Sequence, residues 1–315
     1  MLEILRPGVQ TTVQDLGRQG LRHLGIAVSG ALDRPALRLA NRLVGNPEGA
    51  AGLEIVIGPV VIRFHRAGFL ALTGADFDGT LDDAPVRSGW RQGVRAGQVL
   101  TLHGCRQGMR AYLAVDGGID VPPVLGSRAT DIKAGFGGHQ GRALRAGDHL
   151  NQGEPVPLKG RIGCRLPVWS PALRSIPGPE YDEFSPESRD IFWNSEWAVS
   201  PQSNRMGYRL QGEPLIREAG DDLLSHGVLP GVVQVPPNGQ PIVLLADAQT
   251  TGGYPRIAVV IEADLWKLAQ ARPGARLRFA CCTEADAVQA LQQSRDKLDL
   301  FEQEAYGHRS ECGRG

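Results

Sequence analysis

An internal repeat constrains the fold of this chain more than any other feature. Four short matches recur in the same order: Pro7-Gly8 with Pro177-Gly178, Val28-Ser29 with Val199-Ser200, Ala75-Asp76 with Ala246-Asp247, and Trp90 with Trp266. Their offsets are 170, 171, 171 and 176, so one or two insertions would align all four. Because self-similarity at a steady offset indicates repeated structural units, we expect two related domains whose equivalent loops face one cleft.

The composition indicates that these domains are mainly β. Forty-one glycines and twenty-two prolines in 315 residues imply many turns and therefore many short strands. Helical patterns are few, and they occupy residues 33–44, 186–196, 262–270 and a polar, periodic segment from 283 to about 306. We therefore expect two β-barrel domains, at 1–158 and 159–283, followed by a C-terminal helix and a frayed tail at 284–315.

Charge and cysteine usage narrow the function classes. The 34 basic and 34 acidic residues cancel, which gives no bulk electrostatic case for nucleic acid or an anionic membrane. The sequence has no apolar run of the ~18 residues that a membrane helix needs, and its start does not read as a secretory signal. Five cysteines at irregular spacing favour reduced thiols in the cytoplasm. The histidines and cysteines show no zinc-ligand spacing, so no metal is expected.

The stretch from Ser225 to Pro255 is the strongest candidate for binding chemistry. Val232–Val235 and Ile242–Ala246 are short apolar runs separated by a turn at Pro236–Gly239, which predicts a hairpin. The second strand ends in a polar loop that contains Asp247, Gln249 and the pair Gly252-Gly253. Such loops at strand ends often carry function. The alternative is a turn in which Asp247 caps its own backbone. In the functional interpretation, Asp247→Asn lowers activity and leaves stability unchanged.

Three further stretches concentrate polar residues. The first contains Gln14, Asp15 and Arg18. The second is a glycine-rich loop that follows Asp116-Gly117-Gly118 and contains Arg128. The third, around Asn204-Arg205, places arginines beside a glycine, where they can clamp a carboxylate or remain in an ordinary surface turn.

Two motifs are misleading. Asp76 to Leu81 reads DFDGTL after an apolar strand, as in phosphatases with an aspartate nucleophile. That chemistry requires a parallel sheet with crossover helices, and none is evident between Leu81 and Leu173, so an acidic hairpin turn is the better interpretation. The stretch Gly135 to Gly141 lacks the spacing of a nucleotide-binding loop, and no nucleotide site is recognisable.

Several long strings together resemble the family that contains KipA and the C subunit of bacterial ATP-dependent 5-oxoprolinase. They are TTVQDLGRQG with VSGALD (11–33), AVDGGID with LGSRATD (114–131), VSPQSNRMGYRL (199–210), the stretch 225–255, and ARPG (271–274). The family is related to an allophanate-hydrolase-like module of urea carboxylase. The resemblance covers roughly residues 1–280 and implies two cyclophilin-like β-barrels.

The resemblance also implies a function and partners. It implies a cytoplasmic subunit of an enzyme that opens 5-oxoproline to glutamate, with ATP as co-substrate, a KipI-like B subunit and an A subunit. Biotin is not expected on this chain, because a Met-Lys-Met attachment sequence is absent. The alternatives are a urea carboxylase or allophanate-type subunit, and a non-catalytic antagonist of a kinase inhibitor.

Residue types suggest roles in that chemistry. Opening a lactam requires donors to an oxyanion, cations for phosphate or carboxylate, and a base. The expected catalytic residues are Asp247, Gln249, Asp15 and Asp116. The expected substrate-binding residues are Gln14, Arg18, Arg128, Asn204, Arg205, Gly252 and Gly253.

Overall fold

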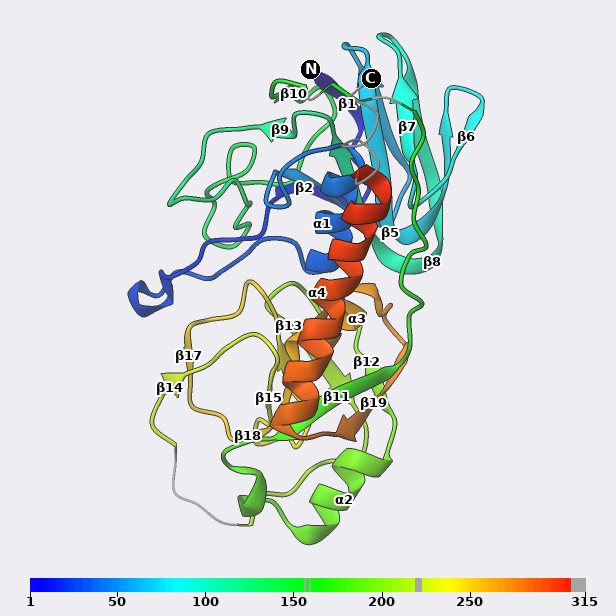
Figure 1. Cartoon of the computed structure of the whole chain (residues 1–315). Coiled ribbons are helices and arrows are strands. Elements are labelled where there is room, and N and C mark those ends of the chain that lie inside the picture. Colours follow the sequence, from blue (N-terminus) through cyan, green and yellow to red (C-terminus); the bar gives the residue numbers. More distant parts are fainter. Residues whose placement is uncertain (156, 159, 219–222, 307–315) are drawn as a thin grey trace. The chain divides into compact units, whose positions relative to one another are not determined.

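The computed structural model of the chain describes residues 1–155, 157–158, 160–218 and 223–306. Its contacts form two compact units, which are described separately (Figure 1). Unit 1 contains residues 1–18, 29–168 and the described chain from 292; unit 2 contains 19–28 and 169–291. Each unit is therefore made of separate segments of the chain, whereas the sequence predicted continuous domains. The tail from residue 307 lies outside the described residues.

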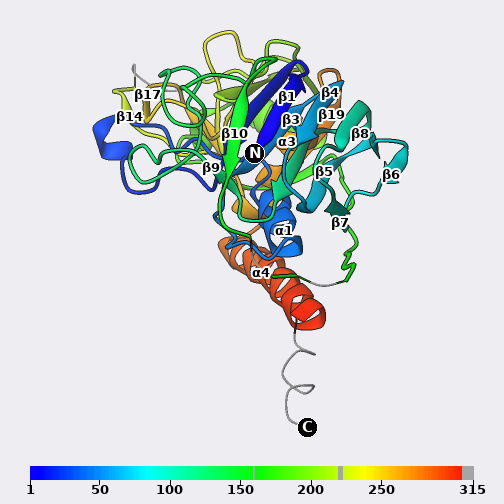
Figure 2. The same ribbon diagram turned by 90° about the horizontal axis from the view of Figure 1, so that it is seen from above.

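Unit 1 is built on a ten-stranded sheet with the order β2-β3-β8-β4-β1-β10-β9, in which β5 pairs with β6, β7 and β8. Its described strand pairs are all antiparallel, and Figure 2 shows β10 alongside β1. The strands are β1 (Leu2–Arg6), β2 (Gln10–Gln14), β3 (Gly52–Val56), β4 (Val60–Phe64), β5 (Gly68–Leu81), β6 (Ala84–Val86), β7 (Arg91–Val94), β8 (Val99–Val115), β9 (Ile119–Asp120) and β10 (His149–Gln152).

The predicted first helix is confirmed as α1 (Arg34–Leu43). Asp33 is its N-cap and accepts a hydrogen bond of 2.9 Å from the Ala36 amide, which satisfies one of the free donors at the helix start. Leu39 and Leu43 lie on its buried face and pack with Ala71 and Ala114 of β5 and β8. The helix thereby covers one face of the sheet.

The glycine-rich segment between β9 and β10 is irregular, as predicted for a functional loop. Its path depends on close backbone contacts. Gly137 has φ of 72°, and a Cβ there would lie 2.2 Å from the Ala129 carbonyl oxygen. Only glycine allows this approach, so the segment is a compact loop packed on itself.

Unit 2 contains a closed barrel with the order β11-β18-β15-β16-β13-β12-β19. The predicted hairpin is confirmed, since β15 and β16 pair antiparallel with Val233 opposite Val243. A separate pair of strands, β14 and β17, flanks the hairpin in the sequence. The strands are β11 (Ala172–Pro177), β12 (Trp197–Val199), β13 (Gly207–Gln211), β14 (His226–Gly227), β15 (Val232–Gln234), β16 (Ile242–Leu244), β17 (Thr251–Gly252), β18 (Arg256–Val260) and β19 (Arg276–Cys281).

The helices of unit 2 are short. They are η1 (Arg22–Leu24), η2 (Tyr181–Glu183), α2 (Pro186–Asn194), η3 (Glu262–Asp264) and α3 (Leu265–Gln270). Ser185 caps α2, accepting a hydrogen bond of 3.1 Å from the Ser188 amide. The C-terminal helix α4 (Glu284–Tyr306) is also confirmed. The chain is therefore mainly β, with two barrel-like sheets and few helices.

One local interpretation was wrong. Asp76 and the following residues do not form a hairpin turn, because they lie inside the long strand β5, and the turn comes at Asp82-Asp83 between β5 and β6. The rejection of the phosphatase motif is upheld. Strand β5 pairs antiparallel with each of its neighbours, so the parallel sheet of that enzyme class is not formed here.

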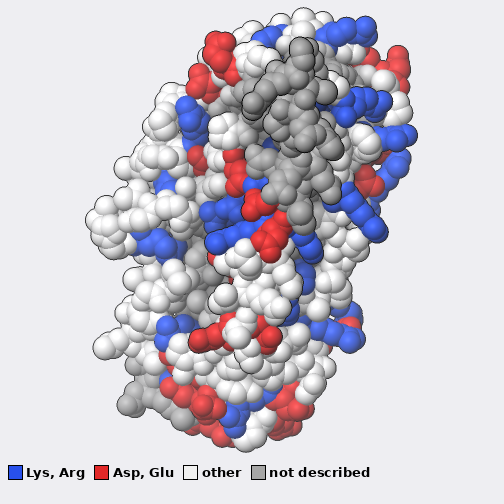
Figure 3. Space-filling model, viewed as in Figure 1, with Lys and Arg blue, Asp and Glu red and all other residues white. Residues whose placement is uncertain are grey.

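The surface agrees with the balanced composition. Figure 3 shows basic and acidic side chains interspersed over the face viewed. Every helix in the described part of the chain is too short or too polar to span a membrane.

Candidate functional site

A buried ion pair organises the end of the central hairpin in unit 2. Both oxygens of Asp247 accept hydrogen bonds from Arg205, from Nε at 2.8 Å and from Nη2 at 3.0 Å. The two side chains are 5% and 6% exposed. The Asp247 amide also donates to the Arg205 carbonyl oxygen at 3.1 Å. The described hydrogen bonds thus favour a bidentate clamp over the alternative in which Asp247 caps its own backbone.

The loop after Asp247 is held by protein contacts. The side chain of Gln249 is exposed. A Cβ on Gly252 would lie 2.8 Å from Nε2 of Gln234, and one on Gly253 would lie 2.9 Å from the Leu223 carbonyl oxygen. The close backbone approach expected at the two glycines is therefore made to the protein itself. Their role as donors to a substrate stays a prediction.

Asn204 lies beside this pair but does not point into it. Its side chain is exposed, and its oxygen accepts a hydrogen bond of 2.8 Å from the Met206 amide. This bond shapes the turn that delivers Arg205 to Asp247. In the described structure, Asn204 therefore has the role of a turn residue.

Sequence reasoning missed Arg22, which reaches the same loop from the beginning of the chain. Its Nη2 donates to the carbonyl oxygens of Val228 and Gln249, the latter at 3.2 Å. Its Nη1 is buried and has no hydrogen-bond partner among the described residues. Burial lowers the pKa of the guanidinium, because removing it from water disfavours the charged form. An anion bound at Nη1 would supply the missing hydrogen-bond partner and would stabilise the charged form of the guanidinium.

His226 is a second residue that was not among the predicted site residues. His226 is paired with Gly252 across β14 and β17. Its Nδ1 donates to the Leu224 carbonyl oxygen at 3.1 Å, since a carbonyl can only accept. In the neutral ring Nε2 then carries the lone pair, and this atom is buried without a partner among the described residues. His226 can therefore accept a proton or a hydrogen bond at Nε2.

The second polar cluster belongs to unit 1 and is centred on Asp15. Its carboxylate accepts three hydrogen bonds from neutral donors: the Gly17 amide at 2.8 Å, the Ser127 hydroxyl at 2.7 Å and the Arg128 amide at 2.6 Å. Asp15 thereby joins the end of β2 to the long irregular loop. All three donors belong to the scaffold, so the described role of Asp15 is to position that loop.

Two buried acceptors beside Asp15 are unsatisfied within the described structure. Gln14 is fully buried and donates from Nε2 to Thr12 and to the Thr130 carbonyl oxygen, while its Oε1 has no partner. The Ser29 hydroxyl, which we did not predict, is also buried without one. Ser29 has φ of 54°, a strained conformation for a residue with a side chain, and such strain clusters at functional sites.

Arg18 is buried and holds the same loop. Its Nε donates to the Val124 carbonyl oxygen at 3.2 Å and its Nη2 donates to Ala129. The guanidinium lies 4.6 Å from the centre of the Phe136 ring, a cation–π contact. Arg18 is therefore committed to the scaffold in the described structure, and anion binding by it stays a prediction.

The side chains of the remaining predicted residues, Arg128 and Asp116, make their described contacts with groups other than Asp15. Arg128 donates from Nε to the Val121 carbonyl oxygen at 2.8 Å, and its Nη2 lies 3.5 Å from Asp120. Asp116 is buried and accepts from the Phe69 amide at 3.2 Å and from Arg66 at 3.4 Å. The described contacts of Asp116 are therefore those of a residue that fixes the end of β8.

The two clusters differ in the chemistry they offer. The cluster in unit 2 presents a partly desolvated guanidinium and an imidazole lone pair, which suit an anion and a proton transfer. The cluster in unit 1 presents unsatisfied oxygen atoms, which suit an N–H group or a water molecule. A small number of placed polar groups is what orients a ligand in a small-molecule site.

Comparison with known proteins identifies the class. Residues 24–281 match the family described as carboxyltransferase domain, subdomain A and B. The match covers most of the chain, and the chain belongs to this family.

Individual proteins of known sequence and structure are also similar to this chain. The chain is 54% identical to the C subunit of 5-oxoprolinase from Escherichia coli, over 97% of this chain and 98% of that protein. It is 43% identical to the C subunit of 5-oxoprolinase from Haemophilus influenzae, over 96% of each. Among solved structures it is similar to K. lactis urea amidolyase, with a TM-score of 0.90 and 32% identity, covering 95% of this chain and 20% of that one.

Proposed function

We propose that the chain is a subunit of an ATP-dependent 5-oxoprolinase that opens 5-oxoproline to glutamate. One observation carries this proposal: the chain matches 98% of the length of a protein named as the C subunit of 5-oxoprolinase, at 54% identity. The urea amidolyase match covers only 20% of that longer chain. We further propose that it acts in the cytoplasm with a KipI-like B subunit and an A subunit, and free thiols at Cys105, Cys164, Cys281 and Cys282 agree with that compartment.

The geometry of unit 2 supports this substrate over urea. 5-Oxoproline carries a carboxylate, whereas urea is neutral. Arg22 offers a buried, unpartnered Nη1 to such an anion, in surroundings where burial disfavours the charged guanidinium. A hydrogen bond to a charged group contributes about 1.5–3 kcal/mol. Arg22 therefore binds the substrate carboxylate, or the phosphate that ATP contributes.

The reaction assigns roles to the remaining groups. The lactam is an unreactive amide, so ATP, the co-substrate of the complex, phosphorylates its carbonyl oxygen and activates the carbonyl carbon for addition of water. His226 accepts a proton from the attacking water at Nε2. The C–N bond then breaks as the nitrogen takes up a proton, and a second water releases phosphate from the resulting acyl phosphate. Asp247 positions Arg205, and Asp15 positions the loop that carries Arg128. Gln249 and Asp116 remain proposed as catalytic residues on residue type alone, and biotin has no role on this chain.

The first experiment compares substrates. ATP hydrolysis by the reconstituted complex is measured with 5-oxoproline and with urea, and the isolated chain is assayed beside it. We expect stimulation by 5-oxoproline and no turnover by the isolated chain. Stimulation by urea alone would instead favour the urea carboxylase-type function, which the similarity to K. lactis urea amidolyase supports.

The second experiment tests the anion site. Arg22→Met in the complex should raise the KM for 5-oxoproline about 10–100-fold, since each 1.4 kcal/mol is a factor of ten. Arg209→Met, on an exposed residue of β13, is the matched control and should change little. Thermal melting of both variants reports whether the loop held by Arg22 stays folded. An unchanged KM in a folded Arg22→Met complex would remove Arg22 from the site.

A further inference from the structure

Three strands of unit 1 bring together ligands that lie far apart in the sequence. On β1, Leu2 is fully buried, so the next residue, Glu3, faces away from the core. Leu2 is opposite Leu150 of β10, and Glu3 is opposite His149. The side chains of Glu3 and His149 therefore lie side by side on the outer face of the sheet.

The strand on the other side of β1 contributes the third group. Phe64, the last residue of β4, is buried opposite Leu2, so His65 turns outward with Glu3. The His65 amide donates to the Met1 carbonyl oxygen at 3.0 Å, which keeps this residue beside β1 although β4 has ended. Glu3 is thus flanked by one histidine from each neighbouring strand.

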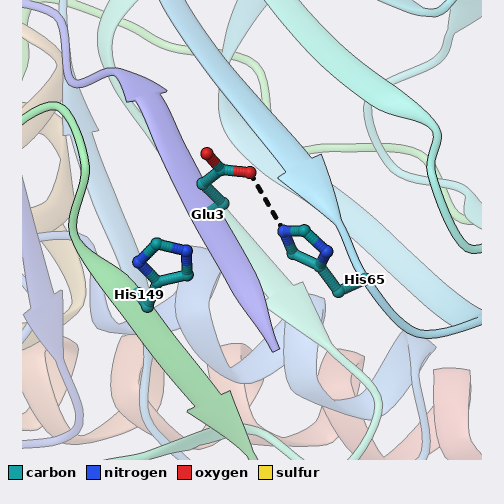
Figure 4. Close-up of side chains that lie close together, drawn as sticks. All are labelled: Glu3, His65 and His149. Carbon is teal, nitrogen blue, oxygen red and sulfur yellow. Dashed lines mark hydrogen bonds and ion pairs between the residues drawn. The ribbon is translucent and has the colours of Figure 1, made fainter.

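The ligand atoms are close enough to share an ion. One atom from each of Glu3, His65 and His149 lies within 4.8 Å of the others. Figure 4 shows the three side chains, with Oε2 of Glu3 at 3.0 Å from Nε2 of His65. The second carboxylate oxygen, Oε1, accepts no hydrogen bond from the described residues. Small rotamer changes would bring three donors to a common ion.

His149 is oriented as metal-binding histidines usually are. Its Nδ1 donates to the Gly147 carbonyl oxygen at 2.9 Å, so Nε2 carries the lone pair in the neutral ring. A hydrogen bond from the other ring nitrogen fixes the tautomer and the ring direction at most metal-bound histidines. This contact is independent of the clustering of the three side chains.

We propose that Glu3, His65 and His149 form a surface site for Zn²⁺, with one carboxylate oxygen and two imidazole nitrogens as ligands. Two nitrogen ligands of three disfavour Mg²⁺ and Ca²⁺, which prefer oxygen. Zn²⁺ accepts this donor set and leaves a fourth position for water. Bound there, the ion links β4, β1 and β10. Strand β10 pairs with β1 at only two positions, so the ion reinforces a short pairing.

Arg63 opposes the ion. Its Nη1 lies 3.1 Å from Oε2 of Glu3, and its side chain is 42% exposed. A cation at this distance repels Zn²⁺ electrostatically, although an exposed arginine can swing into water. If the three side chains form only an ion-pair cluster, Arg63 is a member of it. If they bind a metal, Arg63 weakens the site.

The experiment uses calorimetric titration of the chelator-treated full chain with ZnCl₂. All proteins carry Cys281→Ser and Cys282→Ser, because adjacent free thiols would bind zinc themselves. We expect one Zn²⁺ per chain, a rise in melting temperature, and at least about a tenfold loss of affinity in Glu3→Gln, His65→Ala and His149→Ala, on the scale of losing a supporting contact or more. His103→Ala, an exposed histidine on β8, should bind normally.

Two further measurements sharpen the test. Arg63→Met should bind Zn²⁺ more tightly than the parent protein, because the opposing charge is gone. In electron paramagnetic resonance with Cu²⁺, the signal should show two nitrogen ligands in the parent and one in His149→Ala. Absence of saturable binding, or affinity that is unchanged in all three ligand variants, would overturn the proposal.

Discussion

Asp15 and Asp247 are both buried carboxylates at strand ends, yet they are held in opposite ways. Asp15, in unit 1, accepts from two backbone amides and a hydroxyl, all of them neutral. Asp247, in unit 2, accepts from a single buried guanidinium.

The difference shows that residue type alone does not define a carboxylate's role. Neutral donors fix backbone around Asp15, so this residue shapes a loop. A buried ion pair depends on both partners, because each charge lacks water to compensate it. Asp247 and Arg205 should therefore behave as a unit, and Asp15 as the centre of several weaker contacts. Three variants, in order of expected effect, test this contrast.

The largest effect is expected at Asp247. Asp247→Ala removes the carboxylate from a buried guanidinium and should lower the free energy of unfolding by about 3–5 kcal/mol, measured in urea. The double variant Arg205→Met/Asp247→Leu should recover most of this loss, because no buried charge is left behind. Asp182→Ala, on a side chain that is 91% exposed, is the control. A loss at Asp247 below about 1 kcal/mol, the scale of an exposed pair, would show that the two residues are not a unit.

A smaller loss is expected at Asp15. In Asp15→Asn the new amide must face either the Arg128 amide or the Gly17 amide and Ser127 hydroxyl, so at least one buried donor loses its acceptor. We expect the free energy of unfolding, again measured in urea, to fall by about 1–3 kcal/mol. Asp78→Asn, at an exposed position of β5, should change stability little. If Asp15→Asn cost as much as Asp247→Ala, the contrast between neutral and charged partners would fail.

The smallest effect concerns pH and the end of the loop that Asp15 organises. Hydrogen bonds from Arg142 lower the pKa of Asp148 from 3.8 to about 2. Because the folded pKa lies below the unfolded one, this carboxylate stabilises the fold above about pH 4, and its contribution disappears as the pH falls toward 2. The contribution should stay below about 1 kcal/mol, since the pair is near the surface.

Stability measured from about pH 5 to 2 checks this. The parent should lose stability through that window more steeply than Asp148→Asn. Parallel curves for the two proteins would mean that the Arg142 contact is not maintained in solution.

The sequence predicted what is local. Asp33 and Ser185 were recognisable as helix caps because a cap acts within three residues, and the β15–β16 hairpin was marked by its own turn. Short apolar runs bounded by glycine and proline likewise predicted strands.

Contacts between distant segments were not predictable in this way. Arg205 reaches Asp247 across 42 positions, and Arg22 reaches Val228 across 206. The strand pairing that places His65 and His149 beside Glu3 is set by packing of the whole sheet. His226 was visible in the sequence, but only its tautomer and its buried Nε2 distinguish it from an ordinary loop histidine.

The interleaving of the two units has a consequence for how the chain is made. Residues 19–28 leave the ribosome long before residues 169–291, with which they cluster. Arg22 must therefore wait for Val228 and Gln249 to be synthesised, and unit 1 must wait for the part of helix α4 that begins at residue 292. Neither unit can be obtained whole by cutting the gene at one point. A fragment ending near residue 168 would lack the last part of unit 1 and would contain residues 19–28 of unit 2 without the rest of that unit.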